Sequence, residues 1–442
     1  MYLADRRSAS SASAPPGDRR ATTDHHPRRR AGTALPSTVL VLGTVSLITD
    51  ISSEMVTAVL PLYLVAELGL SPWGFGVLDG VYNGVSALVR LVGGRLSDRG
   101  GGGGHKTVAV VGYGLSALCK PLLLMVHSLP LIGAVLAVDR TGKGLRTAPR
   151  DALISLAAEP AARGRAFGVH RAMDTAGALC GPLVAFVLLR VAAEGYDAVF
   201  TVSFCVAVLG VIVLLLFVPR RIPDAAGAAD DRAPAGPRTP VRTLLRRPEV
   251  RRLTGCAVLL GLTTVSDSFL YLTLQRRLDL PTGWFPLLPL GTAAAFLLLA
   301  VPLGAVADRI GRRRLFLSGH LALLGAYGLL LVWSAGGAAL VCAVLVLHGS
   351  FYAATDGVLA AATADAVPQD ARGSGLAVVQ TGQTAARFVC SLAFGAAWTT
   401  WGDRTAVLTA VIGLALAAAV SACLLRRAVP APTSNSPSED TR

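Results

Sequence analysis

The sequence predicts an all-α membrane protein with 12 transmembrane helices in two pseudo-symmetric six-helix bundles. Hydrophobic residues make up 53% of the 442 residues and charged residues only 15%, a composition typical of chains that reside in a bilayer. The hydrophobic residues form segments of about 20, the length that crosses roughly 30 Å of hydrocarbon. A short polar motif also recurs at the same place in each half of the chain.

Twelve segments have the length and composition of spanning helices, although Gly, Pro or a single charge interrupts several of them. We place them at residues 38–65, 74–96, 107–127, 130–148, 166–190, 198–218, 253–274, 284–306, 314–333, 338–360, 374–398 and 404–425. A polar, basic segment rich in Pro and Ala separates the two groups of six. The predicted organisation is a disordered cytoplasmic tail (1–36), a first bundle (37–218), a cytoplasmic linker (219–252), a second bundle (253–425) and a cytoplasmic tail (426–442).

The net charge of +14 marks membrane topology. In a soluble protein it would suggest nucleic-acid binding, but here Lys and Arg gather before the first span and in the connections after the second, fourth, sixth and eighth spans. These are alternate connections, so the positive-inside rule places them and both termini in the cytoplasm. Arg276 and Arg277 fall on the opposite side, and we interpret them as a local exception.

An internal repeat relates the two halves. "GRLSDR" (94–99) follows the second span, and "GAVADRIGRRR" (304–314) follows the eighth, 210 residues later. A weaker echo pairs "LGTVSLITD" (42–50) with "LGLTTVSD" (260–267), which puts Asp50 and Asp267 at similar depth. Two like halves imply a pseudo-two-fold axis along the membrane normal and a cavity between the halves near mid-membrane.

The Gly-x-x-x-Asp-Arg loop with trailing basic residues resembles the loop signature of the major facilitator superfamily, and the resemblance covers residues 38–425. It implies a secondary active transporter that works by alternating access. The second copy is nearly complete, whereas glycines 100–104 delay the basic pair of the first copy to His105 and Lys106. We expect the loop charges to latch the cytoplasmic side closed, and charge that only sets topology is the alternative. The predicted cytoplasmic gate comprises Gly94, Asp98, Arg99, Gly304, Asp308, Arg309 and Arg312.

The fifth span carries Gly168, Gly177, Gly181 and Pro182 at a spacing that resembles the antiporter signature of proton-coupled drug and metabolite exporters in this superfamily. Gly177 and Gly181 allow another helix to approach closely, and Pro182 bends the helix. The closing Gly-Gly pair of the signature is absent. The motif favours export over uptake, and ordinary tight packing is the alternative.

Asp50 and Glu54 lie one helical turn apart in the first span, on one face of the helix. A charged side chain facing lipid at mid-membrane costs at least about 2.5–3.5 kcal/mol, so this pair requires a cavity or a partner. We therefore expect a proton or a basic group beside it, and predict a titrating or cation-attracting site. A structural pair satisfied by neighbouring helices is the alternative.

Other charged and polar residues within the spans extend this site. Arg140 partly matches a fourth-helix motif of proton-coupled members, in a segment that Lys143 and Arg146 make unusually basic. We hypothesise that Asp50, Glu54, Arg140 and Asp174 handle protons, while residues of the second half line the substrate path. The predicted proton and substrate cavity comprises Asp50, Glu54, Asp79, Asn83, Arg140, Arg171, Asp174, Asp267, Gln383 and Arg387.

These features predict proton-coupled efflux of a small organic molecule or drug. The alternative is a proton symporter that imports a small metabolite such as a sugar or an organic anion, which the basic residues within the spans keep open. We find no nucleotide loop, metal-ligand cluster or nucleophile arrangement, and so predict no enzyme, no catalytic residue and no metal. We expect a monomer in the bacterial inner (plasma) membrane that uses the proton gradient, needs no cofactor, and contacts the lipid bilayer and a small-molecule substrate but no nucleic acid.

Overall fold

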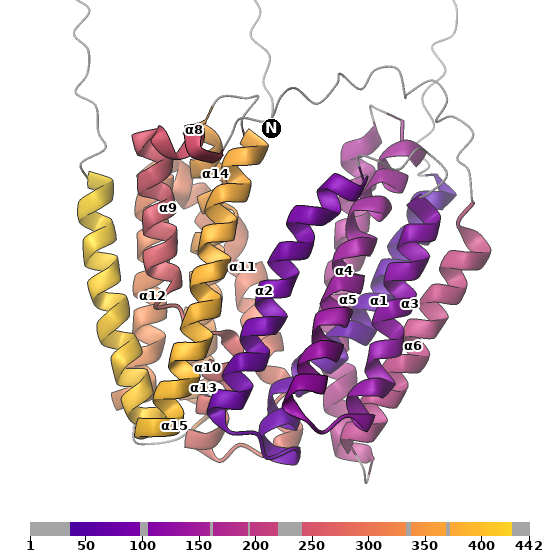
Figure 1. Ribbon diagram of the computed structural model, residues 1–442, viewed down its shortest axis with the longest axis horizontal. Helices are drawn as coiled ribbons and strands as arrows, with labels where there is room; N and C mark the ends of the chain where they lie inside the picture. The colour runs from indigo at the N-terminus through magenta and orange to yellow at the C-terminus, as the bar shows by residue number, and fades with distance from the viewer. Residues whose placement is uncertain are drawn as a thin grey trace, which may run out of the picture. The chain divides into compact units, whose positions relative to one another are not determined.

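Every regular element of the residues that the computed structural model describes is a helix (Figure 1). The described residues are 36–97, 105–159, 162–192, 195–219, 241–332, 337–367 and 372–426. The first half contains α1 (Ser37–Leu62) with the π-helical turn η1 (Tyr63–Glu67), α2 (Pro72–Ser97), α3 (His105–Met125), α4 (Leu129–Ala157), α5 (Arg163–Val191) and α6 (Gly195–Phe217). The second half contains α8 (Val241–Arg246), α9 (Pro248–Gly261), α10 (Asp267–Leu278), η3 (Thr282–Trp284), α11 (Leu287–Ile310), α12 (Arg312–Val332), α13 (Ala338–Thr355), α14 (Val358–Asp365) and α15 (Arg372–Arg426).

Eight helical stretches of the described residues are long and apolar enough to cross a membrane. They are Ser37–Glu67, His105–Met125, Arg163–Val191, Gly195–Phe217, Thr282–Ala307, Arg312–Val332, Ala338–Asp365 and Ser374–Leu425. The last has 52 residues and is bent back on itself, so it is long enough for two crossings (Figure 1). Helices α2 and α4 have 26 and 29 residues, and α4 carries six charged residues between positions 139 and 151.

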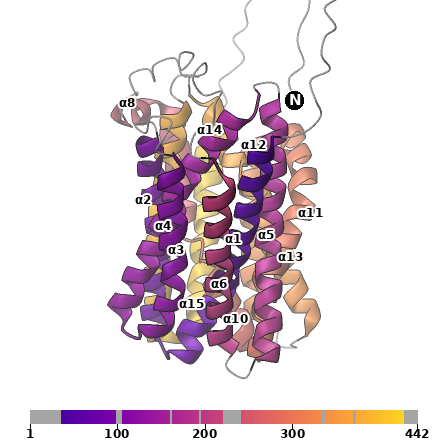
Figure 2. The ribbon, with the colours of Figure 1, turned by 90° about the vertical axis from the view of Figure 1, so that its right-hand side faces the viewer.

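The helices of each half pack mainly on one another. In the first half, α1 lies against α5 and α6, and α4 lies against α2 and α3 (Figure 2). In the second half, α13 lies against α11 and α12, and α15 lies against α9 and α12. The charged helix α4 is therefore placed among other helices, where its side chains meet polar partners instead of acyl chains.

The predicted helix at 253–274 is wrong in one respect, because it is broken into α9 and α10. The hydroxyls of Thr263 and Thr264 both donate to the carbonyl of Leu260, at 3.0 and 2.8 Å. Such side-chain bonds compete with the backbone bonds of a helix, and Thr is a poor helix former for the same reason. The break leaves Asp267 as the first residue of α10.

Near the end of the chain, one glycine interrupts a predicted helix and another lies between two predicted helices. Gly357, at φ 75°, separates α13 from α14 inside the range 338–360, which the sequence predicted as one helix. Gly402, at φ 81° and ψ 167°, marks the bend in α15 between the predicted spans 374–398 and 404–425. Both are backbone conformations that glycine adopts readily and residues with a side chain adopt at a cost.

The two halves touch near the end of the helices that holds the bend of α15, which we call the far end. A Cβ atom on Gly76 of α2 would lie 2.7 Å from the carbonyl oxygen of Ser391 in α15, and one on Gly395 would lie 2.6 Å from that of Pro72. The backbone amide of Trp73 donates to the hydroxyl of Thr399 at 2.9 Å. Only glycine permits backbones to approach this closely.

An aromatic cluster fills the same contact. The ring of Phe269 in α10 lies 4.9 Å from Phe75 of α2 and 4.9 Å from Phe394 of α15, measured between ring centroids. Trp398 completes the cluster, with its ring 5.9 Å from that of Phe394. All four side chains are buried, so apolar surface from both halves closes the far end.

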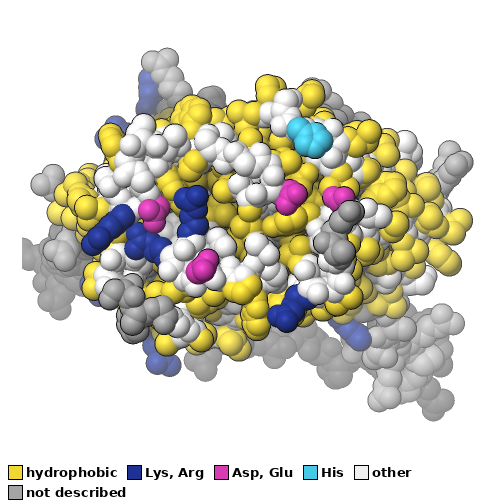
Figure 3. All heavy atoms as spheres, turned by 90° about the horizontal axis from the view of Figure 1, so that it is seen from below, with side chains coloured by type: hydrophobic (Ala, Val, Ile, Leu, Met, Phe, Trp, Pro, Cys, Tyr) yellow, Lys and Arg dark blue, Asp and Glu magenta, His cyan; other side chains and the backbone are white. Residues whose placement is uncertain are grey.

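Arg276 and Arg277, the exception to the charge pattern, have partners at the far end. Arg277 pairs with Asp403 at 3.3 Å and also donates to the carbonyl of Leu330. The guanidinium of Arg276 lies 5.6 Å from the ring of Trp398. Figure 3 shows this face, with patches of both charge signs scattered over a largely hydrophobic surface.

Candidate functional site

The two acids of α1 are paired with bases on α4. Asp50 accepts from Arg146 at 3.2 Å, and Glu54 accepts from Lys143 at 3.2 Å. One turn further along, Arg150 donates to the hydroxyl of Ser46 at 3.2 Å. We call these three contacts the α1–α4 ladder.

The two ion pairs of the ladder differ in burial. The side chain of Arg146 is 3% exposed and that of Asp50 is 12% exposed. The side chains of Lys143 and Glu54 are 34% and 25% exposed. Asp50 and Arg146 therefore form a buried structural pair, whereas Glu54 and Lys143 remain accessible.

The glycines of α5 hold α1 against the ladder. A Cβ atom on Gly177 would lie 2.6 Å from the carbonyl oxygen of Leu47, and one on Gly181 would lie 2.8 Å from that of Ile51. These contacts lie one turn apart, directly beside Asp50 and Glu54. Pro182 is buried in α5, whereas a Cβ atom on Gly168 would meet nothing within 4 Å.

Asp174 of α5 pairs with α4. It accepts from Arg150 at 3.4 Å, so Arg150 links α4 to both α1 and α5. Arg171, three residues before Asp174, is exposed. Both residues were predicted to line the cavity, and Asp174 meets a base that projects from the neighbouring helix.

Arg140 belongs to a separate polar cluster. It pairs with the adjacent Asp139 at 2.6 Å, and its guanidinium lies 4.1 Å from the centre of the Tyr82 ring. Asp139 also accepts from the hydroxyl of Ser116 at 2.5 Å. Arg140 thus stabilises the contact among α2, α3 and α4, and the bases that meet Asp50 and Glu54 are Arg146 and Lys143.

Asp79 connects the two halves. It is buried in α2 and accepts from the hydroxyl of Ser391 in α15 at 2.6 Å. Asn83, one turn along α2, donates to the backbone carbonyl of Asp79 at 2.9 Å. The carboxyl of Asp79 therefore lies within the contact that closes the far end.

Asp267 is held by α13. The hydroxyl of Tyr352 donates to its two oxygens at 2.7 and 2.9 Å, and Nε2 of His348 lies 3.0 Å from one of them. Because α9 ends at Gly261, Asp267 stands at the start of α10 instead of inside a continuous helix. The sequence did not indicate either partner, since both lie more than 80 residues away along the chain.

A cavity of about 340 Å³ lies between the two halves. From the first half, α1 contributes Glu54, Thr57 and Pro61 to its wall. The second half contributes residues of α10, α11 and α13, including Asp267 and Tyr352. Carboxylates from both halves thus face one cavity of the size that binds small molecules.

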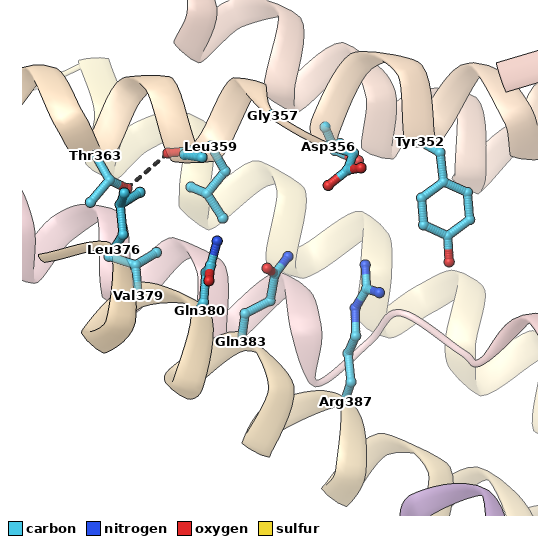
Figure 4. Close-up of a pocket in the computed structure, with 12 residues that line it drawn as sticks. Tyr352, Asp356, Gly357, Leu359, Thr363, Leu376, Val379, Gln380, Gln383 and Arg387 are labelled. Carbon is cyan, nitrogen blue, oxygen red and sulfur yellow. Dashed lines mark hydrogen bonds between the residues drawn. The ribbon is translucent and has the colours of Figure 1, made fainter. Parts of the chain in front are cut away.

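A second pocket of about 110 Å³ adjoins the break between α13 and α14. Figure 4 shows Gln380, Gln383 and Arg387 of α15 on one side, facing Asp356 and Tyr352 on the other. Gln383 and Arg387 were predicted from the sequence to line a substrate path. Asp356 and Tyr352 line both this pocket and the larger cavity.

The family model of the Major Facilitator Superfamily matches residues 42–298 and 282–442 of the chain. The chain belongs to the Major Facilitator Superfamily. This superfamily member is therefore a transporter of small molecules across a membrane and not an enzyme, and transporters of this kind need no cofactor. No cluster of His, Cys, Asp or Glu suited to a metal ion occurs in the part of the chain that the structure describes.

Sequence relatives of this transporter occur in archaea and bacteria. It is 26% identical over 398 residues to an uncharacterised transporter of the same superfamily from Methanocaldococcus jannaschii. The aligned region covers 86% of the chain and 94% of the relative. It is 35% identical over 188 residues to an uncharacterised protein of Mycobacterium tuberculosis, covering 42% of the chain and 44% of that protein.

Solved structures share the fold. A nucleoside transporter superposes with a TM-score of 0.73 at 12% identity, covering 88% of this transporter and 99% of that chain. A peptide transporter has a TM-score of 0.71 at 14% identity, covering 89% of this transporter and 95% of that chain. A bacterial homologue of the human lysosomal transporter Spinster, in an inward-facing conformation, has a TM-score of 0.67 at 13% identity, covering 90% and 98%.

The predicted gate of this superfamily member is described in part. Asp98 and Arg99 lie outside the described residues, as does the side chain of Asp308. Gly94 lies in α2, while Gly304 and Arg309 are exposed in α11. Arg312, at the start of α12, forms an ion pair with Asp365 at the end of α14, which ties this loop to the broken helix α13–α14.

Two sets of site residues escaped the sequence analysis. Lys143, Arg146 and Arg150 recur at intervals of three and four residues and so occupy one face of α4. Matching that face to the acids of α1 would have found the ladder. Asp356 and Tyr352 gave no comparable signal, because their importance depends on the break at Gly357.

Proposed function

We propose that this chain is a proton-coupled exporter that exchanges a small organic molecule for protons by alternating access. The carrying observation is that Glu54 takes part in an ion pair with Lys143 and also lines the cavity between the halves. One carboxylate is therefore accessible to a proton, to Lys143 and to whatever occupies the cavity.

Coupling follows from competition for this carboxylate. A proton on Glu54 removes its negative charge and releases Lys143, whereas a substrate that brings a positive charge or a hydrogen-bond donor to Glu54 favours the deprotonated form. The neighbouring pair of Asp50 and Arg146 keeps α1 and α4 in register throughout, because its two charges are too deeply buried to separate cheaply. The ion pair of Arg150 and Asp174 extends this series of charged contacts from α4 to α5.

The antiporter-like glycines support exchange. Gly177 and Gly181 place the backbone of α5 against α1 beside both acids, so a change at Glu54 reaches α5 directly. Movement of α5 would then pass to the second half through its contacts with η3 and α11. Gly168 completes the motif without making such a contact.

We infer that this conformation faces inward, with both termini in the cytoplasm of a bacterium and the far end outside. The aromatic cluster and the glycine contacts that close the far end support this orientation. The basic loops at the opposite end agree with the positive-inside rule. In the outward-facing state, Asp98, Arg99, Asp308 and Arg309 would latch the cytoplasmic side, and a single copy of the chain contains all these parts.

Inverted membrane vesicles test the proposal. An imposed pH gradient, acid inside the vesicle, should drive uptake of a fluorescent or radiolabelled substrate found by a susceptibility panel on a deletion strain. Glu54→Gln should abolish the gradient dependence while leaving substrate exchange at equal pH. Unchanged gradient-driven transport by both Glu54→Gln and Asp50→Asn, at normal expression, would exclude these acids from proton coupling.

The alternative function is proton symport of an imported metabolite, such as a sugar or an organic anion. The smaller pocket favours it, since Arg387, Gln380 and Gln383 offer the donors that such solutes require. Structural neighbours described as nucleoside and peptide transporters are compatible with a polar substrate. The same vesicles distinguish the two functions, because a symporter would move substrate and protons in the same direction.

A further inference from the structure

The cavity between the halves has an unusual charge balance. Three carboxylates line it: Glu54 from α1, Asp267 from α10 and Asp356 at the end of α13. No Lys or Arg is among the residues of the described chain that line it. The wall that a bound molecule meets is therefore acidic.

The three carboxylates differ in how far their charge is balanced. Glu54 is paired with Lys143, which is not among the residues that line the cavity. Asp267 accepts hydrogen bonds from Tyr352 and contacts His348. Asp356 is exposed, and the described part of the chain gives it no ion pair. Arg387 faces Asp356 across the adjoining pocket without pairing with it, so Asp356 is the least balanced of the three carboxylates.

The remaining wall suits an apolar or aromatic body. Phe285, Phe296 and Tyr271 line the cavity. Thr292 also lines it and is 5% exposed, so its hydroxyl offers a bound molecule a hydrogen-bonding group within this wall.

We propose that this cavity binds organic cations, in which a protonated amine or a quaternary ammonium group is attached to a small aromatic or apolar body. The ammonium group lies at Asp356 and Asp267, and the body lies against the aromatic side chains, whose ring faces also attract cations. The volume of about 340 Å³ limits the ligand to a small one. The inference rests on the proposed function in one respect, namely that this cavity is the transport site.

Equilibrium binding to the purified full-length chain in lipid nanodiscs tests the charge preference directly. Three probes of similar shape are compared: (4-hydroxyphenyl)trimethylammonium, its neutral isostere 4-tert-butylphenol, and 4-hydroxybenzenesulfonate. The cation should bind at least about tenfold more tightly than either of the others, because only it pairs with the acidic wall. Equal binding of the cation and the neutral isostere, or preference for the sulfonate, would overturn the proposal.

Variants assign the preference to the cavity. Asp356→Asn should weaken binding of the cation by about tenfold and leave the neutral isostere unchanged. Asp279→Asn is the matched control, since Asp279 is an exposed acid at the opposite end of α10 from Asp267 and has a positive φ of 47° that Asn tolerates. If Asp356→Asn proves unstable, Asp267→Asn replaces it. Unaltered cation binding by a folded variant of each acid would refute the site.

The binding measurement uses no pH gradient, so it separates this inference from the proposed function. A chain that bound the cation selectively but did not exchange it for protons would refute proton-coupled export and leave the cation site intact. A chain that exported another class of molecule without binding the cation would do the reverse.

Discussion

At the scale of single residues, the two acids of α1 have different surroundings although they lie one turn apart. Asp50 meets a base that is almost fully buried, whereas Glu54 reaches both a half-exposed base and the cavity. Removing one partner of a buried ion pair leaves an uncompensated charge, while an accessible charge can recover hydration. Asp50 is therefore chiefly structural, and Glu54 is free to take part in transport.

This difference in burial predicts that replacing Asp50 affects stability much more than replacing Glu54. Asp50→Asn should destabilise the protein by about 3–5 kcal/mol, because Arg146 stays buried without its counter-charge. Glu54→Gln should change the thermal midpoint in detergent little. The double variant Asp50→Asn with Arg146→Gln should recover part of the loss. A midpoint for Asp50→Asn equal to that of Glu54→Gln would contradict this assignment.

At the scale of elements, the packing of α5 on α1 depends on Gly177 and Gly181. A methyl group on Gly181 would lie within 3 Å of the backbone of α1, whereas one on Gly168 would meet no atom within 4 Å. The same substitution therefore has very different consequences at two positions of one helix.

Gly181→Ala should destabilise the protein by about 1–3 kcal/mol and reduce transport, since α1 must move away from α5 and disturb the ladder. Gly168→Ala is the matched control and should be tolerated. Thermal unfolding and vesicle transport measure both effects. Equal behaviour of the two alanine variants would show that the observed packing does not constrain α1.

The break between α13 and α14 provides a second prediction at this scale. Gly357→Ala should destabilise the protein by about 1–2 kcal/mol, because a Cβ atom at φ 75° is strained even though no neighbour lies within 4 Å. Gly357→Asn should cost a similar amount, because ψ of −35° places this residue outside the left-handed α region that Asn adopts readily. Thermal midpoints of the two variants provide the test, and an Ala variant as stable as the native protein would argue against a conformational role.

At the scale of the whole molecule, the proposed alternating access requires the far end to open. The contacts of Gly76 with Gly395, the aromatic cluster and the hydrogen bond of Asp79 to Ser391 must all separate when the halves rock. A covalent bond across this contact should hold the molecule in one state.

Paired cysteines at Trp73 and Thr399, in a variant whose 7 native cysteines are replaced, should cross-link. The backbone amide of Trp73 lies 2.9 Å from the hydroxyl of Thr399, so the two side chains start from adjacent backbones. Oxidation should reduce transport by about tenfold or more, and a reductant should restore it. Each single cysteine serves as the control. Full activity of the oxidised pair would exclude separation at this point.

Topology gives the other prediction at this scale. In the same cysteine-free background, a cysteine at Asp279 should react with a membrane-impermeant thiol reagent in intact cells. A cysteine at Arg313, in the basic segment after α11, should react only after the membrane is permeabilised. The reverse pattern would invert the proposed orientation and place the termini outside.

The sequence by itself determined the class of fold and the helical segments, because each span must satisfy its own backbone hydrogen bonds and its hydrophobic length is written locally. It also located Asp50, Glu54 and the glycines of α5. Only the tertiary structure decided that Arg146 and Lys143 are the partners of those acids, that α9 and α13 end in breaks, and that Asp356 faces a shared cavity. Those features depend on which helix lies beside which, and such contacts between residues far apart in the chain leave no periodic signal within a single segment.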